Sequence, residues 1–418
     1  MRDDASITAE VERQLTEITR GAVDIHSTEQ LREKIERSIR AGHPLRVKAG
    51  FDPTTPDIHI GHTVLLTRMR RFQQFGHKVI FVVGDFTASI GDPTGRSTTR
   101  PNLDGETIRR NAETYKAQAF KVLDRESTEI RFNSEWLKRL GVSGLMELAA
   151  KYTVARMLER DDFKKRFRGG TPISIHELLY PLLQAYDSVA LQADVELGGT
   201  DQLFNLLVGR EIMRDYGLQP QIVITSPLLE GLDARESNGK IVGEKMSKSL
   251  ANYVGVDEAP EEIFGKLMSI SDALMWRYFE LLSDLETDEL EKLEKDVAAG
   301  ELHPKKAKVR LAREIVARFH DSSAADMAEE AFDRLHRRKQ VPDEVPEAKL
   351  DFETGPLPMA RVMLETGLAG STSDAKRLIK QGGVRVDGRR FTDPRGNLEA
   401  GDHLLQVGKR KFLRIRPR

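Results

Sequence analysis

Hydrophobic and polar positions alternate with two different periods in the first part of the chain. Short runs rich in β-branched residues at 45–51 and 79–83 indicate buried strands. Between them, residues 62–75 carry apolar side chains at helical spacing, which predicts a helix. A strand, a crossover helix and a second strand form a parallel unit, so the sequence predicts a parallel α/β sheet.

The same two periods continue to about residue 255. Further strands are expected at 129–132 and 221–225, and helices at 107–123, 174–191 and 203–216. An earlier helix is expected from Ser27, which has capping-box spacing with Gln30, to about Arg40, where Gly42 supplies a stop. Residues 1–255 therefore predict a Rossmann-type, doubly wound parallel sheet with a helical insertion.

The rest of the chain changes pattern twice. Residues 256–340 carry helical patterns alone, which predicts an all-helical domain. Residues 341–355 contain prolines and neither period, as expected of a linker. Residues 356–418 predict two short helices, at 359–365 and 373–381, followed by strands, and hence a small α+β domain.

Composition narrows the class of protein. The chain has 418 residues, of which 39% are apolar and 31% charged, as in ordinary globular proteins. It contains no cysteine, which excludes disulfides and thiolate metal sites. Residues 1–20 lack the apolar core of a signal peptide and no apolar run approaches a membrane span, so a cytoplasmic protein without a membrane partner is expected.

The net charge of -1 hides an asymmetry along the chain. Residues 356–418 hold 14 basic and 6 acidic side chains, a net charge of +8, whereas residues 1–355 hold 51 and 60, a net charge of -9. The last stretch, 405–418, has six basic residues and no acid. Such a basic module suits a polyphosphate partner, and the alternative is a solvated charged tail.

The first chemical motif is His59-Ile60-Gly61-His62, where a strand's loop meets the next helix. A helix N-terminus offers unpaired N–H groups to an anion, and glycine lets a flat base approach the backbone. Two histidines three residues apart would face one ligand. A zinc pair is the alternative, but no cysteine or nearby third histidine completes a zinc site, so no metal ligand is assigned.

The second motif is Lys245-Met246-Ser247-Lys248-Ser249, which follows a glycine-bearing loop. Two lysines and two hydroxyls on a mobile segment can reach a polyphosphate and stabilise the charge of a departing pyrophosphate. Alone, this pentapeptide could be a solvated surface loop. In this order, and on this kind of fold, the two motifs together are a much more specific signal of function than either motif alone.

Together the two motifs resemble the signatures of class I aminoacyl-tRNA synthetases, which they match letter for letter. The resemblance implies that ATP is a substrate bound in the crevice of the sheet, that Mg²⁺ accompanies it, and that an amino acid carboxylate attacks its α-phosphate. It also implies catalytic roles for four side chains: His59, His62, Lys245 and Lys248. The other nucleotide contacts that these motifs imply are Gly61, Met246, Ser247 and Ser249.

A third set of residues bears on which amino acid is activated. Tyr180, Gln184 and Asp187 are spaced to share one face of a helix that begins at a capping box, Ser174 with Glu177. Standing alone, this polar stripe could be a buried hydrogen-bonded network. Here it resembles the substrate helix of tyrosyl-tRNA synthetases, in which the aspartate accepts a hydrogen bond from the substrate phenol and the other two hold the α-ammonium group of L-tyrosine.

The resemblance carries over to further positions. Asp92, in a GDPTG sequence, matches another contact to the ammonium group, and Gln202 a further tyrosine contact. Asp52, Gly199 and Asp201 match contacts to the nucleotide, with Asp201 suited to the ribose hydroxyls. A P-loop reading of residues 91–97 fails, because the glycines are too close together and an arginine replaces the lysine.

One position departs from the family pattern. In the better-known branch a second tyrosine contacts the substrate phenol from the strand position that is Lys48 here, so recognition of the hydroxyl depends more heavily on Asp187. Tryptophanyl-tRNA synthetases, which share the fold, are the alternative, but they would not be expected to keep Tyr180, Gln184 and Asp187 together.

The resemblance extends over most of the chain. Residues 256–340 take the place of the anticodon-binding domain, and residues 356–418 resemble the small RNA-binding domain found at the C-terminus of bacterial tyrosyl-tRNA synthetases. These likenesses imply tRNA(Tyr) as a partner, and a homodimer formed through the insertion. A synthetase-like RNA-binding or splicing factor with an idle site is the alternative from another class, and intact motifs argue against it.

Overall fold

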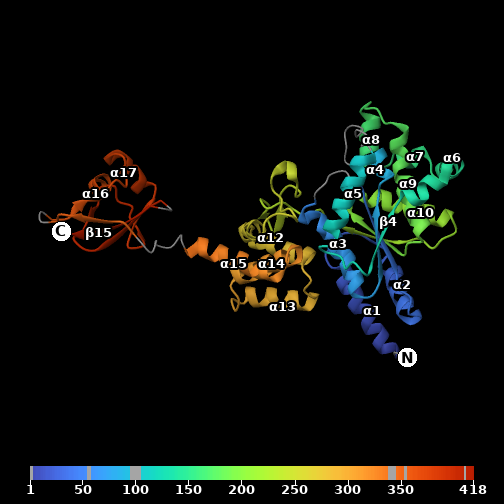
Figure 1. Ribbon diagram of the computed structural model, residues 1–418, viewed down its shortest axis with the longest axis horizontal. Coiled ribbons are helices and arrows are strands. Elements are labelled where there is room, and N and C mark those ends of the chain that lie inside the picture. Colours follow the sequence, from blue (N-terminus) through green and yellow to red (C-terminus); the bar gives the residue numbers. More distant parts are fainter. Residues whose placement is uncertain (1–2, 54–57, 95–104, 338–344, 353–354, 409–410) are drawn as a thin grey trace. The chain divides into compact units, whose positions relative to one another are not determined.

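The computed structural model describes residues 3–53, 58–94, 105–337, 345–352, 355–408 and 411–418. The chain divides into two compact units, Met1–Glu329 and Glu330–Arg418 (Figure 1). The strands of the first unit are β1 Ile25–His26, β2 Arg46–Phe51, β3 Lys78–Val83, β4 Thr128–Phe132, β5 Val195–Gly199, β6 Ile222–Ser226, β7 Arg235–Ser237 and β8 Lys240–Val242. Its first ten helices are α1 Asp4–Thr19, α2 Thr28–Ala41, α3 Ile60–Gln74, α4 Thr87–Ile90, α5 Gly105–Ala119, α6 Ser134–Ala150, α7 Val154–Met157, α8 Asp161–Arg168, α9 Ile175–Leu191 and α10 Leu203–Asp215.

The predicted parallel sheet is confirmed. Six strands lie in the order β1-β6-β5-β2-β3-β4, and all the pairs except β1 with β6 are parallel. The sequence analysis missed β5, whose letters VELGG combine an acid with two glycines and carry no β-branched run. It is nevertheless a central strand, because its neighbours β2 and β6 bury it from both sides.

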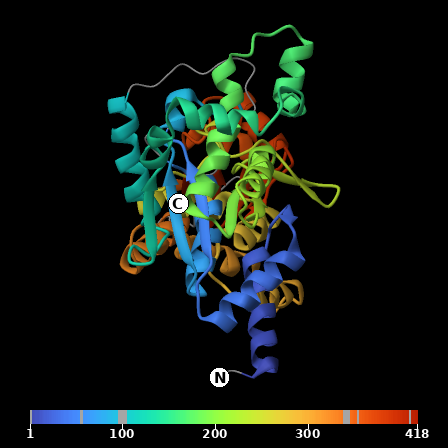
Figure 2. The ribbon, with the colours of Figure 1, turned by 90° about the vertical axis from the view of Figure 1, so that its right-hand side faces the viewer.

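The helices of this unit lie on both faces of the sheet (Figure 2). α3 packs on β2, β3 and β5, while α6, α9 and α10 share a core with Ile80 and Val82 of β3. The predicted start of α2 is confirmed, because the Ser27 hydroxyl accepts from the Gln30 N–H at 3.3 Å. The insertion helices α6 to α8 lie at the end of the unit opposite to α1 (Figures 1 and 2).

The order of the strands fixes where a ligand can bind. From β2 the chain moves outward to β3 and β4, and it then returns to build β5 and β6 on the other side of β2. Neighbouring crossovers therefore diverge between β2 and β5, which leaves a crevice at the carboxyl ends of these two strands.

The helical prediction for the region after residue 256 is confirmed. The helices are α11 Pro260–Ser269, α12 Asp272–Leu282, α13 Thr287–Ala298, α14 Pro304–Phe319 and α15 Ser322–Arg337. α12 packs on α3, and the compact unit continues to Glu329, so this region and the sheet are not separated in space. The finer boundaries at 255 and 340 stay predictions.

The second unit has its own sheet and core. Its elements are β9 Glu347–Leu350, β10 Leu357–Pro358, α16 Met359–Glu365, α17 Thr372–Lys380, β11 Val384–Val386, β12 Arg389–Arg390, β13 Asn397–Leu398, β14 His403–Val407 and β15 Lys411–Pro417. The predicted linker is not wholly irregular, because β9 pairs in parallel with β15. The basic C-terminal stretch is not a solvated tail either, since Leu413 and Ile415 of β15 belong to the core. Lys409 and Arg410 lie outside the described residues.

Within the part of the chain described above, no helix is long and apolar enough to cross a membrane.

Candidate active site

Two adjoining cavities occupy the crevice between β2 and β5. The inner cavity, of about 250 Å³, is lined by Asp52, Asp92, Tyr180, Gln184, Asp187 and Gln202 among others. The outer cavity, of about 510 Å³, is lined by His59, Gly61, His62, Asp201, Lys245 and Lys248 among others. Both are lined by Phe51, His62, Leu65, Tyr115 and Gly199, so a ligand that spans them would pass over the ends of β2 and β5.

Helix α9 carries the polar stripe of the inner cavity. The predicted capping box is present, since Glu177 Oε1 accepts from the Ser174 N–H at 2.9 Å. From this start the helix brings Tyr180, Gln184 and Asp187 to the same cavity, as their spacing predicted.

Asp52 lines the inner cavity and is not among the residues that line the outer cavity. Tyr180 Oη donates to Asp52 Oδ2 at 2.8 Å, and Thr87 Oγ1 donates to Oδ1 at 2.8 Å. Burial, together with the nearby carboxylates of Asp92 and Asp187, nevertheless raises the pKa of Asp52 to about 7. The cavity thus favours a positively charged group at this point.

Asp187 lies at the other end of the stripe, next to the insertion. Burial raises its pKa to about 7, against the effect of Lys48 and of two donors. Those donors are Trp136 Nε1, at 2.8 Å from Oδ1, and Asn133 Nδ2, at 3.5 Å from Oδ2. Asp187 is thus fixed in position and can still accept a hydrogen bond from a further donor.

A network that the sequence analysis missed connects the insertion to the inner cavity. Arg160 is buried and donates to Thr94 Oγ1 at 2.7 Å and to Asn205 Oδ1 at 3.2 Å. Asn205 Nδ2 in turn donates to Gln184 Oε1 at 3.1 Å and to Gln202 Oε1 at 3.0 Å. Nothing in the spacing around Arg160 signals this role, because its partners come from three separate segments.

The same network reaches Asp92. Gln202 Nε2 donates to Asp92 Oδ2 at 2.8 Å, and Arg160 Nη2 lies 3.7 Å from Oδ1. Gln202 and Asp92 are therefore held together at the wall of the inner cavity. Of the GDPTGRS segment, residues 95–97 lie outside the described part of the chain.

The histidine motif caps α3 and presents donors to the outer cavity. His59 Nδ1 accepts from the Gly61 N–H at 3.1 Å, and His62 Nδ1 accepts from the His59 N–H at 3.2 Å. Burial lowers the pKa of His59 to about 3 and that of His62 to about 4, so both rings are neutral near pH 7. A neutral ring that accepts at Nδ1 carries its proton on Nε2, which leaves an N–H donor for an anion.

Glycine is required in the middle of this motif. A Cβ atom at Gly61 would lie 2.9 Å from the His59 ring and 3.6 Å from Cβ of Met246. The first distance is shorter than real contacts allow, so a larger residue would displace the capping ring. The second distance shows that the two motifs lie side by side, although more than 180 residues separate them in the sequence.

The lysine motif is anchored beside the histidine motif. Met246 is only 4% exposed, and its N–H donates to the Leu229 carbonyl at 2.7 Å. Asn252 Oδ1 accepts from the Ser247 N–H at 2.8 Å. Lys245 and Lys248 both line the outer cavity, whereas Ser249 is not among its lining residues and pairs with the Ser247 hydroxyl at 2.8 Å.

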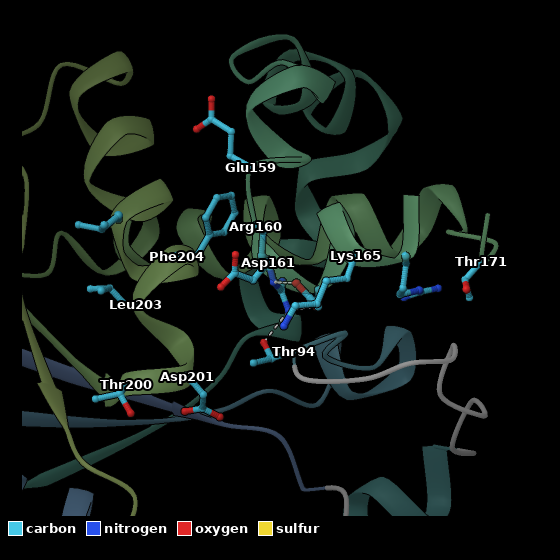
Figure 3. Close-up of a pocket in the computed structure, with 13 residues that line it drawn as sticks. Thr94, Glu159, Arg160, Asp161, Lys165, Thr171, Thr200, Asp201, Leu203 and Phe204 are labelled. Carbon is cyan, nitrogen blue, oxygen red and sulfur yellow. Dashed lines mark hydrogen bonds and ion pairs between the residues drawn. The ribbon is translucent and has the colours of Figure 1, made fainter. Parts of the chain in front are cut away.

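A third cavity, of about 870 Å³, lies between α10 and the insertion. Figure 3 shows Leu203 and Phe204 on one of its sides and Lys165 on the other. It has Asp201 in common with the outer cavity and Thr94 in common with the Arg160 network. It therefore opens directly beside the crevice.

Comparison with known proteins agrees with this geometry. Residues 40–337 match the family of class I tRNA synthetases for tryptophan and tyrosine (W and Y), and residues 360–404 match the S4 domain. The chain is 57% identical to a tyrosine–tRNA ligase of Geobacter sulfurreducens, over 96% of this chain and 98% of that one. It is 54% identical to tyrosine–tRNA ligase 2 of Vibrio parahaemolyticus, over 97% and 99%.

Solved structures share the fold. The tyrosyl-tRNA synthetase of Archaeoglobus fulgidus in complex with L-tyrosine aligns with a TM-score of 0.59 at 24% identity, over 75% of this chain and 99% of that one. A C-terminally truncated mitochondrial tyrosyl-tRNA synthetase of Coccidioides posadasii aligns with a TM-score of 0.61, also at 24% identity, over 78% and 97%. With the family match and the identity over nearly the full length, the chain belongs to the tyrosyl-tRNA synthetases, class I enzymes that use ATP to attach tyrosine to tRNA.

Proposed function

We propose that the inner cavity binds the tyrosine substrate and the outer cavity binds ATP, so that the two meet over the ends of β2 and β5. The observation that carries this proposal is the shared wall of the cavities, which includes His62 and Gly199. Two substrates in adjoining cavities are held within reaction distance, and this positioning supplies much of the rate enhancement of a bimolecular step.

The inner cavity offers partners to the α-ammonium group and to the hydroxyl of tyrosine. Asp92, Tyr180 and Gln184 hold the α-ammonium group, and Asp52 adds a carboxylate to the same region through its bond to Tyr180. Asp187 accepts the phenol hydroxyl. The substrate carboxylate is then directed toward the outer cavity, where it attacks the α-phosphate of ATP while the bond to pyrophosphate breaks.

The outer cavity stabilises the charge that develops on the phosphates. The Nε2–H groups of His59 and His62 donate to phosphate oxygens, aided by the N-terminus of α3. Lys245 and Lys248 neutralise the departing pyrophosphate. Gly61, Met246, Ser247 and Ser249 provide backbone and hydroxyl contacts, and Asp201, beside Gly199, binds the ribose.

Mg²⁺ accompanies ATP in this proposal. Among the described residues, no three His, Asp or Glu side chains gather closely enough to hold a metal ion. An ion of this kind is commonly held by phosphate oxygens and water with few protein ligands. The steps above are assigned to residues of the chain alone.

We further propose a homodimer formed through the insertion, acting in the cytoplasm. Of the eleven large apolar side chains that are exposed in the described residues, five lie between residues 142 and 175. They are Val142, Met146, Val154, Phe167 and Ile175. Such a concentration on one segment is typical of a protein interface. Residues 256–340 and 356–418 then contact tRNA(Tyr), the latter through its basic surface.

Asp187→Asn tests the assignment of the inner cavity. The amide keeps the shape of the side chain but removes the charge that accepts the hydroxyl, so kcat/KM for tyrosine should fall by about tenfold or more while that for phenylalanine stays the same or rises. Glu33→Gln, at an exposed carboxylate of α2, is a matched control. An Asp187→Asn enzyme that keeps its full preference for tyrosine would place hydroxyl recognition elsewhere.

A further inference from the structure

A buried pair of opposite charges lies under the floor of the inner cavity. Lys48 of β2 and Glu196 of β5 are direct neighbours in the sheet, and Nζ lies 2.8 Å from Oε1. Two residues further along the same strands, Gly50 and Gly198 line the inner cavity. Because side chains of a strand alternate between faces, Lys48 and Glu196 point to the face that carries the cavity.

The pair is isolated from solvent and firmly held. Lys48 is 0% exposed and Glu196 is 2% exposed. The second oxygen of Glu196 accepts from Ser188 Oγ at 3.0 Å and from Gln221 Nε2 at 2.9 Å. Glu196 is the one described residue that forms an ion pair with the Lys48 ammonium. A pair so deeply buried contributes little net stability, so its presence calls for another explanation.

Helix α9 connects the pair to the hydroxyl-binding residue. Ser188, which donates to Glu196, directly follows Asp187 in the chain. Of the two charges, Lys48 acts on the Asp187 carboxyl more strongly than Glu196 does. The ammonium of the pair therefore favours the ionised form of Asp187, and the Glu196 carboxylate opposes it.

We propose that Lys48, held by Glu196, is a specificity-determining residue: its ammonium favours the ionised form of the Asp187 carboxyl, which accepts the hydroxyl of tyrosine and rejects phenylalanine. This inference rests on the proposed role of Asp187. It explains how a lysine serves at this position without contacting the substrate, since Lys48 is absent from the residues that line the inner cavity. Lys48 is thus a positioning residue that acts through Asp187.

The charge of Asp187 decides selectivity because phenylalanine offers it no donor. A buried carboxylate left without its partner is costly, which is the established basis of discrimination in this family. A neutral carboxyl left without a donor would cost less free energy, so phenylalanine would be rejected less strongly. The other groups that act on Asp187 are the neutral donors Trp136 of α6 and Asn133, the residue before α6, and the carboxylate of Glu196. Asp52 lies nearby in the inner cavity. Among the described residues, Lys48 is the cation that lowers the pKa of Asp187.

The test compares pH profiles of selectivity in the full-length enzyme. The ratio of kcat/KM for tyrosine to that for phenylalanine is measured by ATP–pyrophosphate exchange from pH 6 to pH 9. This quantity reports on the free enzyme, and titrations that affect both substrates alike, such as those of Asp52 and of the substrate ammonium, cancel in the ratio. In the unchanged enzyme the ratio should rise with pH through about 7, the pKa of Asp187.

Two variants separate charge from packing. Lys48→Met/Glu196→Gln removes both charges, so that no carboxylate is left buried without a partner. An opposite charge lowers a carboxyl pKa by about one to three units, and the loss of Glu196 offsets part of that effect, so this variant should move the rise about one pH unit toward alkaline values. Its ratio at pH 7 falls about fivefold, as the ionised fraction drops from about a half to about a tenth, and is regained at pH 9. Glu196→Gln alone keeps the ammonium and should leave the rise in place or move it toward acid.

The outcomes distinguish the inference from the assignment beneath it. If the double variant keeps the original profile, if both variants shift in the same direction, or if its loss of selectivity is not regained at high pH, the role of Lys48 is refuted. If Asp187→Asn keeps its full preference for tyrosine, the assignment of the inner cavity fails instead.

Discussion

Tyrosine binding should release protons near neutral pH, because two carboxyl groups of the inner cavity share an unusual pKa. Burial raises the pKa of both Asp52 and Asp187 to about 7, so at pH 7 each is about half protonated in the free enzyme. The substrate ammonium beside Asp52 and the substrate hydroxyl at Asp187 both favour the ionised form. Binding at pH 7 should therefore expel up to about one proton in total, half from each group.

The direction of the pH dependence follows from the same two groups. Near pH 9 both are already ionised and the release approaches zero, whereas near pH 6 both are mostly protonated and the release increases. Because protons are released on binding, the affinity for tyrosine should rise as the pH increases through 7. Asp187 and Asp52 contribute separately to the number of protons released, so removal of one carboxyl group leaves the release from the other.

Isothermal titration calorimetry measures this release directly. Tyrosine is titrated at pH 7 in two buffers of different ionisation enthalpy, and the difference in observed enthalpy gives the number of protons. Asp187→Asn should reduce the release by about half a proton. Tyr180→Phe should increase it, because loss of the donor to Asp52 Oδ2 raises the pKa of that carboxyl further. Equal enthalpies in both buffers would refute the electrostatic description of the cavity.

Three further changes test other parts of the enzyme. Alanine at both Lys245 and Lys248 should remove a few kcal/mol of transition-state stabilisation and so slow adenylate formation, while the Kd for tyrosine, measured by calorimetry, stays nearly constant. An unchanged rate of pyrophosphate exchange would contradict the assignment of these two lysines. Arg160→Met should raise KM for tyrosine about tenfold through the lost charged hydrogen bonds, whereas the exposed control Arg156→Met should leave it unchanged; equal effects would argue against the network. Deletion of residues 356–418 should leave pyrophosphate exchange intact and weaken tRNA charging with a shallower salt dependence, and full charging at ordinary salt would exclude a role in tRNA binding.

The sequence predicted the parts of the fold that local rules determine. β2, α3 and β3 have the hydrophobic period of their type, and the caps of α2 and α9 follow from side chains three residues apart. The polar residues of α9 line one cavity, as predicted, because helical spacing alone sets which residues share a face.

What the sequence could not predict depends on long-range pairing. β5 has no strand pattern of its own, and Glu196 within it is tolerated because β2 places Lys48 opposite. Arg160 reaches Thr94 and Asn205 through folding of the insertion, which no local spacing records. Such partners become visible only when the strands and the insertion are brought together.

The central claim, that the two adjoining cavities activate tyrosine with ATP, is tested most directly by amino-acid-dependent ATP–pyrophosphate exchange. The full-length enzyme is assayed with tyrosine, phenylalanine and tryptophan in turn. The arrangement of Asp187 and its buried donors Trp136 and Asn133 predicts rapid exchange with tyrosine and exchange lower by orders of magnitude with the other two. Comparable exchange with phenylalanine or tryptophan, or none with tyrosine, would contradict it.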